Sequence, residues 1–256
     1  MGIQIKTMKK LENKVAVITG GNSGIGLTTA ILFAEHGAKV AVTGRNSETL
    51  KDAAHLIGHN ALGIVSDVND LEAIGKAYEQ VEQSLGKIDV LVINAGIGEA
   101  APLATFSEKQ FDDTINVNFK GVFFSVQRAL PYLNDGASIV LTSSATNEKG
   151  FAGYAAYAAT KAAVRSLARS FSTELMDRSI RVNVLSPGAI DTPFFGRSGA
   201  TEEQVSGIKA YMSSIIPAKR LGTSEEVAEA FLFLASDSSK YMLGSEIVMD
   251  GGVKTL

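Results

Sequence analysis

The chain contains no cysteine and only three histidines, His36, His55 and His59. Without thiols it can form neither disulfide bonds nor thiolate metal sites. The histidines do not have the spacing of a metal-ligand set, and nothing beside them completes one. We therefore expect no bound metal.

The sequence also lacks a basic excess and a long apolar run. Its formal net charge is −3 and it has no block of lysine and arginine, so a nucleic-acid partner is not expected. No apolar run reaches the roughly 18 residues of a membrane-spanning helix. The start, "MGIQIKTMKKLENK", is basic but has no apolar core of a signal peptide. We expect residues 1–10 to be a flexible leader, no membrane contact, and a cytoplasmic protein.

Strand-like and helix-like segments alternate through all 256 residues, 45% of which are apolar. This order predicts an α/β fold with a doubly wound parallel sheet of about seven strands and helices on both faces. A long helical region is expected from about Ser107 to Leu133, and an irregular stretch of about 30 residues from Ile190 to Leu221. Because no break in composition or linker occurs, residues 1–256 are predicted to form a single domain. The expected strands are "KVAVIT", "AKVAVTG", "ALGIVSD", "IDVLVINAG", "ASIVLTSS", "IRVNVLSPG" and "SEIVMDGG".

The first expected strand runs into a glycine-rich loop, "TGGNSGIG", and then into a helix. Gly20 permits a tight turn, Gly24 lets the backbone approach a phosphate, and Gly26 lets helix and strand pack closely. Amide groups at the helix N-terminus would face the anion, which the helix dipole also favours. The Gly-x-x-x-Gly-x-Gly spacing differs by one residue from the usual dinucleotide fingerprint, so alone it also fits a purely structural turn.

Two residues at the ends of the next strands bear on which dinucleotide binds. Arg45 stands where NAD-binding proteins usually carry an acid, and a guanidinium can grip a 2′-phosphate. This favours NADP(H) over NAD(H), with a solvated arginine at a strand end as the alternative. Asp67 is placed either to accept a bond from the adenine amino group or to cap the following helix.

Tyr157 and Lys161 are four residues apart in an alanine-rich helical segment, so they project from the same helix face. A cation about 4 Å from a phenol stabilises the phenolate by about 4 kcal/mol at an effective dielectric constant of about 20. That would lower the pKa of the tyrosine by roughly three units, before desolvation opposes the change, and make it a useful acid–base. The alternative is a core tyrosine with a lysine extending past it. Ser143 and Ser144 end the preceding strand at the sheet edge where ligands of open α/β sheets bind.

Further segments occur in a fixed order along the chain: "TGGNSGIG", "INAG", "INVNFKGVF", "IVLTSSAT", "YAATK", "SPGAIDTPF" and "DGG". With these motifs nearly the whole chain resembles the single-domain branch of the short-chain dehydrogenase/reductase family. The resemblance implies a Rossmann-type fold and hydride transfer between a nicotinamide and a carbonyl or alcohol carbon. It is specific for the family but not for a substrate.

The resemblance also implies residue roles. Tyr157 would be the acid–base, Lys161 its partner and Ser144 the hydrogen-bond donor to the substrate carbonyl. Asn118 would hold a water that links Lys161 to solvent. Family members that prefer NADP often carry a second basic residue where this chain has Ser23, so the NADP(H) preference depends on Arg45 alone. The implied cofactor-binding residues are Gly20, Asn22, Ser23, Gly24, Ile25, Gly26, Arg45, Asp67, Val68, Asn94, Ala95, Gly96, Tyr157, Lys161, Pro187, Gly188, Ile190 and Thr192.

In the resembled fold, residues 190–221 close over the substrate and exclude water. Their apolar side chains are consistent with a bulky carbonyl compound; burial in the core or at a subunit interface is the alternative. The expected pocket residues are Phe151, Tyr154, Phe194, Phe195 and Tyr211.

Three functions are therefore weighed. The first is an NADP(H)-dependent carbonyl reductase or alcohol dehydrogenase, and the second is a 3-oxoacyl-carrier-protein reductase. The second expects a basic docking patch, which Arg128, Arg165, Arg169 and Arg197 do not obviously form. The third, a nicotinamide-sensing regulator without catalysis, is disfavoured by the intact set of predicted catalytic residues. By resemblance we expect a homotetramer.

Overall fold

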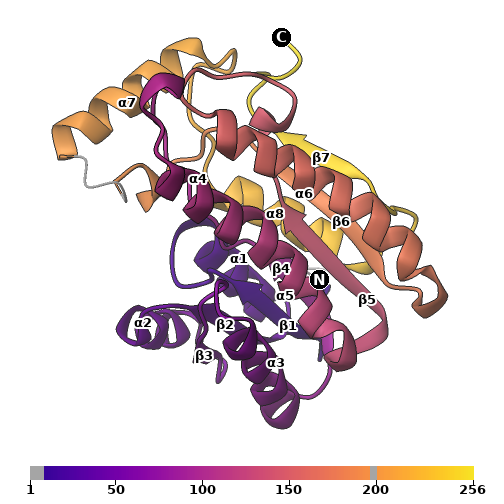
Figure 1. Ribbon diagram of the computed structural model, residues 1–256. Helices are drawn as coiled ribbons and strands as arrows, with labels where there is room; N and C mark the ends of the chain where they lie inside the picture. Colours follow the sequence, from indigo (N-terminus) through magenta and orange to yellow (C-terminus); the bar gives the residue numbers. More distant parts are fainter. Residues whose placement is uncertain (1–8, 197–200) are drawn as a thin grey trace, which may run out of the picture.

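A computed structural model describes residues 9–196 and 201–256 of the chain (Figure 1). Its centre is a seven-stranded parallel sheet in the order β3-β2-β1-β4-β5-β6-β7. This confirms the predicted α/β class. The strands are β1 (Val15–Thr19), β2 (Lys39–Gly44), β3 (Leu62–Val65), β4 (Ile88–Ile93), β5 (Leu133–Thr142), β6 (Arg181–Pro187) and β7 (Glu246–Met249).

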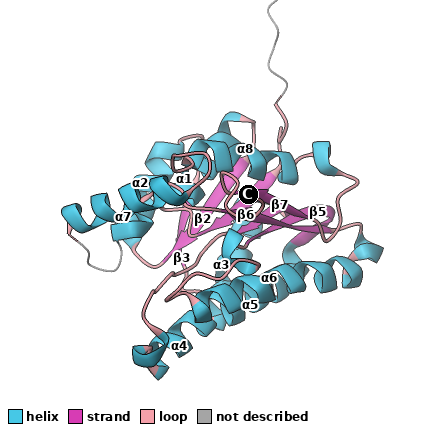
Figure 2. Ribbon diagram, turned by 90° about the horizontal axis from the view of Figure 1, so that it is seen from above, coloured by secondary structure: helices cyan, strands magenta, loops and turns pink. Residues whose placement is uncertain are grey.

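Helices cover both faces of the sheet (Figure 2), and an apolar core lies on each face. Alternate residues of a strand point to opposite faces, so Val17 packs in one core and Ile18 in the other. One core is closed by α3 (Leu71–Leu85), α5 (Gly121–Ala129) and α6 (Ala155–Glu174). The other is closed by α1 (Gly24–Glu35), α2 (Ser47–Ile57) and α8 (Ser224–Ala235). Burial on both faces explains why the central strands are almost wholly apolar.

The long helical region predicted from about Ser107 to Leu133 is confirmed as far as Tyr132, although it is not one regular helix. The segment forms α4 (Glu108–Ile115), a π-helical turn (Asn116–Lys120), α5, and a 3₁₀ turn (Leu130–Tyr132) that contains Pro131. Leu133 already belongs to β5, where it pairs with Ile88. Proline ends the helix because it lacks an N–H donor, and a π-turn inserts one residue into the helical register.

The predicted irregular stretch between Ile190 and Leu221 contains a helix, α7 (Glu202–Ile215). Thr201 and Gln204 form a capping box at its start. No residue of α7 is buried. Its apolar residues Val205, Ile208, Met212 and Ile215 nevertheless recur at helical spacing, a pattern that sequence analysis overlooked. Ile216, the residue after α7, is 3% exposed and lies near Gly251, so it packs with the C-terminal segment.

The N-terminal part of the described chain is fixed from Leu11 onward. Leu11 is buried, and its amide donates to the His36 carbonyl. Residues 1–8 of the predicted leader lie outside the described residues, so its flexibility stays a prediction. Among the helices that the structure describes, none combines the length and apolarity needed to cross a membrane.

Candidate active site

The site lies where the strand order reverses. β1 pairs with β2 on one side and β4 on the other, so the loops after β1 and β4 leave the same sheet edge in diverging directions. In open parallel sheets, the crevice between such loops is where ligands bind. The glycine loop follows β1, and Asn94–Gly96 follows β4.

The glycine loop packs too closely for side chains at two of its positions. Gly20 has a φ of +64°, and a Cβ there would come within 3.0 Å of the Ala95 Cα. A Cβ on Gly26 would lie 2.4 Å from the Gly20 carbonyl oxygen. The turn predicted at Gly20 is thus confirmed, and α1 begins directly behind it at Gly24.

Hydrogen bonds to Thr19 connect the residues after β4 to the glycine loop. The Thr19 hydroxyl accepts hydrogen bonds from the amides of Asn94 (3.0 Å) and Ala95 (3.1 Å). The Asn94 side chain donates to the carbonyls of Thr19 and Gly20, each at 3.2 Å. Sequence analysis missed Thr19, because nothing in a strand-end threonine indicates which neighbouring strand it will meet.

The residue expected to bind the adenosine half of the dinucleotide, Arg45, lies at the surface. Arg45 is exposed and pairs with no carboxylate within the part of the chain that the structure describes. Nearby, Asn22 donates to the Thr49 hydroxyl (2.9 Å), which links the glycine loop to α2.

Asp67 accepts a bond from the Asn69 amide, whereas Asp70 caps α3 through the amides of Glu72 and Ala73. The interpretation of Asp67 as the helix cap is therefore wrong. Val68 lies against Gly121, at the start of α5.

The predicted catalytic side chains converge at the carboxyl end of β5. The Ser144 side chain lies close enough to the Tyr157 hydroxyl to affect its pKa, and the Ser144 Oγ accepts from the Thr146 amide (3.2 Å). The Lys161 Nζ lies 5.5 Å from the centre of the Tyr157 ring and donates to the Thr142 carbonyl (2.9 Å). The pairing of tyrosine and lysine on one face of α6 is confirmed.

The expected fall in the tyrosine pKa is not found. Burial raises the pKa of Tyr157 to about 12, against the opposing effect of the Ser144 hydrogen bond. Burial also lowers the pKa of Lys161 to about 8. The prediction counted the attraction between ammonium and phenolate and gave too little weight to desolvation, which disfavours the charged form of both groups.

Asn118, fully buried in the π-turn, clamps the loop after β4. Its Oδ1 accepts from the Ile97 amide (2.9 Å) and its Nδ2 donates to the Ile97 carbonyl (2.8 Å). A Cβ on Gly96 would lie 3.3 Å from Asn118 Oδ1 and 3.6 Å from Lys161 Nζ, so the three residues are neighbours. Both polar groups of Asn118 bind main chain, which leaves its predicted part in holding a water a prediction.

The segment after β6 reaches back over the glycine loop. Pro187 and Gly188 end the strand, and the Gly188 amide donates to the Met249 carbonyl (2.9 Å). Ile190 is buried and forms a bridge with Gly222, and Thr192 lies 3.4 Å from the position of a Cβ on Gly24.

Phe194, one of the five predicted pocket residues, packs against the loop after β4. Its ring packs on Gly98, where an added Cβ would lie 2.3 Å from Cζ. Phe195 stacks edge-on against Phe194, and Tyr154 stacks edge-on against Tyr157 with centroids 6.0 Å apart. Phe151 is partly buried, whereas Tyr211 is 62% exposed.

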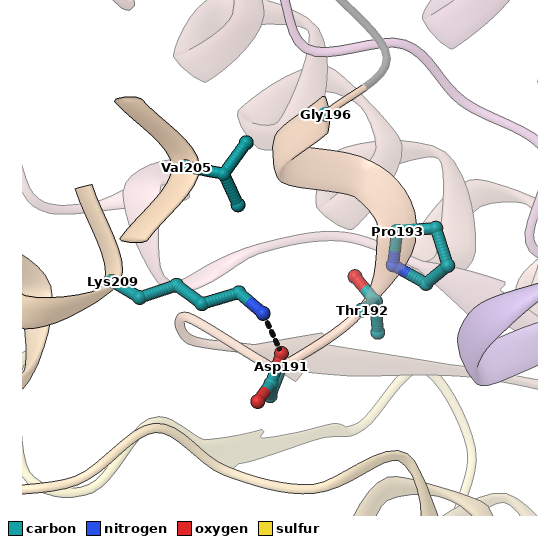
Figure 3. A pocket seen from close by; sticks show the side chains of 6 residues that line it. All are labelled: Asp191, Thr192, Pro193, Gly196, Val205 and Lys209. Atoms are coloured by element: carbon teal, nitrogen blue, oxygen red, sulfur yellow. Dashed lines mark ion pairs between the residues drawn. The ribbon is translucent and has the colours of Figure 1, made fainter. Parts of the chain in front are cut away.

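A pocket of about 600 Å³ lies beside this segment (Figure 3). Lys209 and Val205 of α7 face the turn from Asp191 to Gly196, and Lys209 Nζ pairs with Asp191 at 2.6 Å. Sequence analysis missed this pair because it did not predict α7. None of the five predicted substrate residues lines this pocket, and neither do Ser144, Tyr157 and Lys161. Its lining residues are Asp191, Thr192, Pro193, Gly196, Val205 and Lys209.

Comparison with known proteins gives a consistent result. The family model described as enoyl-(acyl carrier protein) reductase matches residues 20–254. The chain is 41% identical over 249 residues to a 3-oxoacyl-[acyl-carrier-protein] reductase of Thermotoga maritima, covering 95% of this chain and 99% of that one. It is 39% identical over 251 residues to the oxidoreductase asL5 of Sarocladium schorii, covering 97% and 99%.

Solved structures agree in fold. A short-chain dehydrogenase/reductase of Brucella melitensis superposes with a TM-score of 0.90 at 34% identity, covering 98% of this chain and all of that one. One from Serratia marcescens gives 0.88 at 30% identity, covering 96% and 100%. The matches in sequence and in structure both extend over nearly the full length of the proteins compared. The chain belongs to the short-chain dehydrogenase/reductase family of oxidoreductases.

Proposed function

We propose that this chain is an NADP(H)-dependent carbonyl reductase or alcohol dehydrogenase that acts on a small to medium ketone or secondary alcohol. The observation that carries the proposal is the convergence of Tyr157, Ser144 and Lys161 beside the glycine loop. A phenol beside a serine hydroxyl, with a buried ammonium next to it, is equipped to exchange a proton with a substrate oxygen.

The residues around the glycine loop fit a dinucleotide. Gly24 begins α1 with a φ of +53°, so the amides of the first turn face the loop. Arg45 is exposed and without a carboxylate partner among the described residues, so it is free to meet a 2′-phosphate. The Asn94–Gly96 loop, held by Thr19 and Asn118, would line the ribose side. When bound, the nicotinamide supplies or accepts the hydride.

In the mechanism, Ser144 orients the substrate oxygen by a hydrogen bond, and Tyr157 gives that oxygen its proton in reduction or removes it in oxidation. A pKa of about 12 keeps Tyr157 protonated at neutral pH, so the resting enzyme is ready to act as the acid. Lys161 stabilises the phenolate that forms, since its ammonium lies at the ring. Asn118 keeps the loop at Ile97 in place next to Lys161.

The test is Tyr157→Phe, assayed with a panel of ketones and alcohols and both nicotinamides. We expect kcat to fall by about a thousandfold, because proton transfer is lost. The dissociation constant for NADPH should change by less than about twofold, since the ring remains. Turnover that is unchanged in this variant would contradict the mechanism.

The second candidate is a 3-oxoacyl-carrier-protein reductase. It is favoured by the 41% identical Thermotoga maritima relative and by a 37% identical relative from Mycobacterium tuberculosis, which is also a 3-oxoacyl-[acyl-carrier-protein] reductase. Against it, Arg165 pairs with Glu148 and Glu246 and so adds no free charge to a docking patch. Arg197 lies outside the described residues. Assay of a 3-oxoacyl thioester beside simple ketones decides between the two: no thioester reduction excludes this candidate.

A further inference from the structure

We propose that Glu246, on the edge strand β7, is a positioning residue for the catalytic serine and lysine, an inference that rests on the proposed function. It acts through a chain of hydrogen bonds that ends on the two elements carrying Ser144 and Lys161.

The chain starts at the Glu246 carboxylate. Its Oε1 accepts from Asn147 Nδ2 (2.5 Å) and from the Ser186 hydroxyl (2.6 Å). Asn147 Nδ2 also lies 3.2 Å from the Ser143 Oγ, and the Ser143 hydroxyl donates to the Lys161 carbonyl (2.7 Å). Ser143 is the neighbour of Ser144, so one connected set of hydrogen bonds spans β7, the end of β5 and α6.

The other oxygen of Glu246, Oε2, forms ion pairs, one of them with a residue of α6. Arg165 Nε pairs with Oε2 at 2.6 Å, and Arg165 stands one helical turn beyond Lys161. Lys254 of the C-terminal segment lies 3.5 Å from the same oxygen. Arg165 and Lys254 also both pair with Glu148. We call Glu148, Arg165, Glu246 and Lys254 the Glu246 cluster.

The Glu246 side chain is 9% exposed, so its charge must be compensated inside the protein. Burial would raise its pKa, but the hydrogen bonds from Ser186 and Asn147, aided by Lys254 and Arg165, outweigh burial and hold the pKa below its ordinary value. The carboxylate is therefore a fixed acceptor at neutral pH. A fixed acceptor on the last strand sets how α6 lies against the end of β5, and with it the spacing of Ser144, Tyr157 and Lys161.

The test compares Glu246→Ala with Glu246→Gln. Alanine removes the acceptor, and because small displacements of reacting groups cost large factors in rate, kcat should fall by about tenfold or more. KM for NADPH should stay within about twofold. Glutamine keeps an acceptor for Asn147 and Ser186 but loses the ion pairs, so kcat should stay within about threefold of wild type while the melting temperature falls in both variants.

Asp89→Ala is the matched control. Asp89 is also a partly buried carboxylate, 16% exposed, and accepts from the Val15 amide, Lys14 and Asn134. It lies at the opposite end of β4 from the site, so its loss should lower the melting temperature and leave kcat unchanged.

A double-mutant cycle with Ser143→Ala tests the route. If Glu246 acts through Ser143, the losses in kcat of the two single variants should not add in the double variant. Additive losses, a glutamine variant as slow as the alanine variant, or an alanine variant with wild-type kcat would each overturn the inference. A wild-type protein that reduces no ketone or thioester would instead overturn the proposed function.

Discussion

At the scale of single residues, Lys161 is a group whose proposed function requires a buried charge, and burying that charge lowers the stability of the fold. Its side chain is 4% exposed, its Nζ donates to a carbonyl, and within the described residues no carboxylate pairs with it. Burial lowers its pKa from 10.5 to about 8. Between these two values the unfolded chain binds more protons than the folded one, so the contribution of Lys161 makes the free energy of unfolding rise with pH.

This predicts the pH dependence of Lys161→Met. The variant lacks the titrating ammonium group, so the rise of the free energy of unfolding with pH that Lys161 causes should be absent from it. Relative to the variant, the wild type should become more stable by about 3 kcal/mol between pH 8 and pH 10.5. Urea unfolding at a series of pH values measures this. Tyr157 titrates in both proteins and largely cancels, so a difference that stays constant with pH would refute the prediction.

Arg45 provides the second prediction at this scale. Arg45→Ala should raise the KM for NADPH by about tenfold or more and leave the KM for NADH unchanged, because a charge-assisted bond to a 2′-phosphate is lost. Lys51→Ala, which removes another exposed cation from the adjacent α2, is the control and should change neither value. Equal weakening of both cofactors by the Arg45 variant would show that Arg45 does not read the phosphate.

At the scale of elements, two helices with the same N-terminal motif have opposite surroundings. α7 and α8 both begin with a threonine capping box, formed by Thr201 with Gln204 and by Thr223 with Glu226. α7 buries none of its residues, whereas α8 buries Val227, Phe231 and others in the core. An element with few buried contacts can open locally while the core stays folded.

Thr201→Ala should therefore act on substrate binding and Thr223→Ala on global stability. Loss of a cap costs about 1 kcal/mol in each helix. In α7 this should raise the KM for the carbonyl substrate by about fivefold without changing the melting temperature, because Val205 and Lys209 of α7 line the pocket. In α8 it should lower the melting temperature and leave KM unchanged. A Thr201 variant that behaves like the Thr223 variant would argue against a mobile lid.

The elements also show where sequence reasoning reached its limit. Long apolar strands and the helix of Tyr157 could be predicted, because their patterns are local and strongly periodic. The π-turn at Asn118 could not, since it depends on a partner, Ile97, that is 21 residues away in sequence. α7 could have been predicted, because Val205, Ile208 and Ile215 recur at helical spacing; what the sequence could not tell is that this face stays unburied.

At the scale of the whole molecule, the exposed apolar side chains point to assembly. Tyr241 and Leu243 stand just before the edge strand β7, and Leu256 ends the chain; all three are exposed. We expect a homotetramer, with a mass by light scattering of about four times the 26.9 kDa of the chain. Leu243→Asp should reduce that mass if the β7 edge takes part, and a monomeric wild type would contradict the prediction. The predictions of one domain and of a cytoplasmic location stay predictions.

The sequence by itself determined the sheet, its parallel order and the meeting of Ser144, Tyr157 and Lys161 at one edge. These follow from local patterns: apolar runs must be buried on both faces, and residues four apart share a helix face. Only the tertiary structure decided the pKa values and the long-range hydrogen-bond partners of the residues in the site. Desolvation, and not the neighbouring ammonium, sets the pKa of Tyr157, and the Glu246 cluster joins residues that are up to about a hundred positions apart. Burial and long-range partners are properties of the packed chain, so no local pattern encodes them.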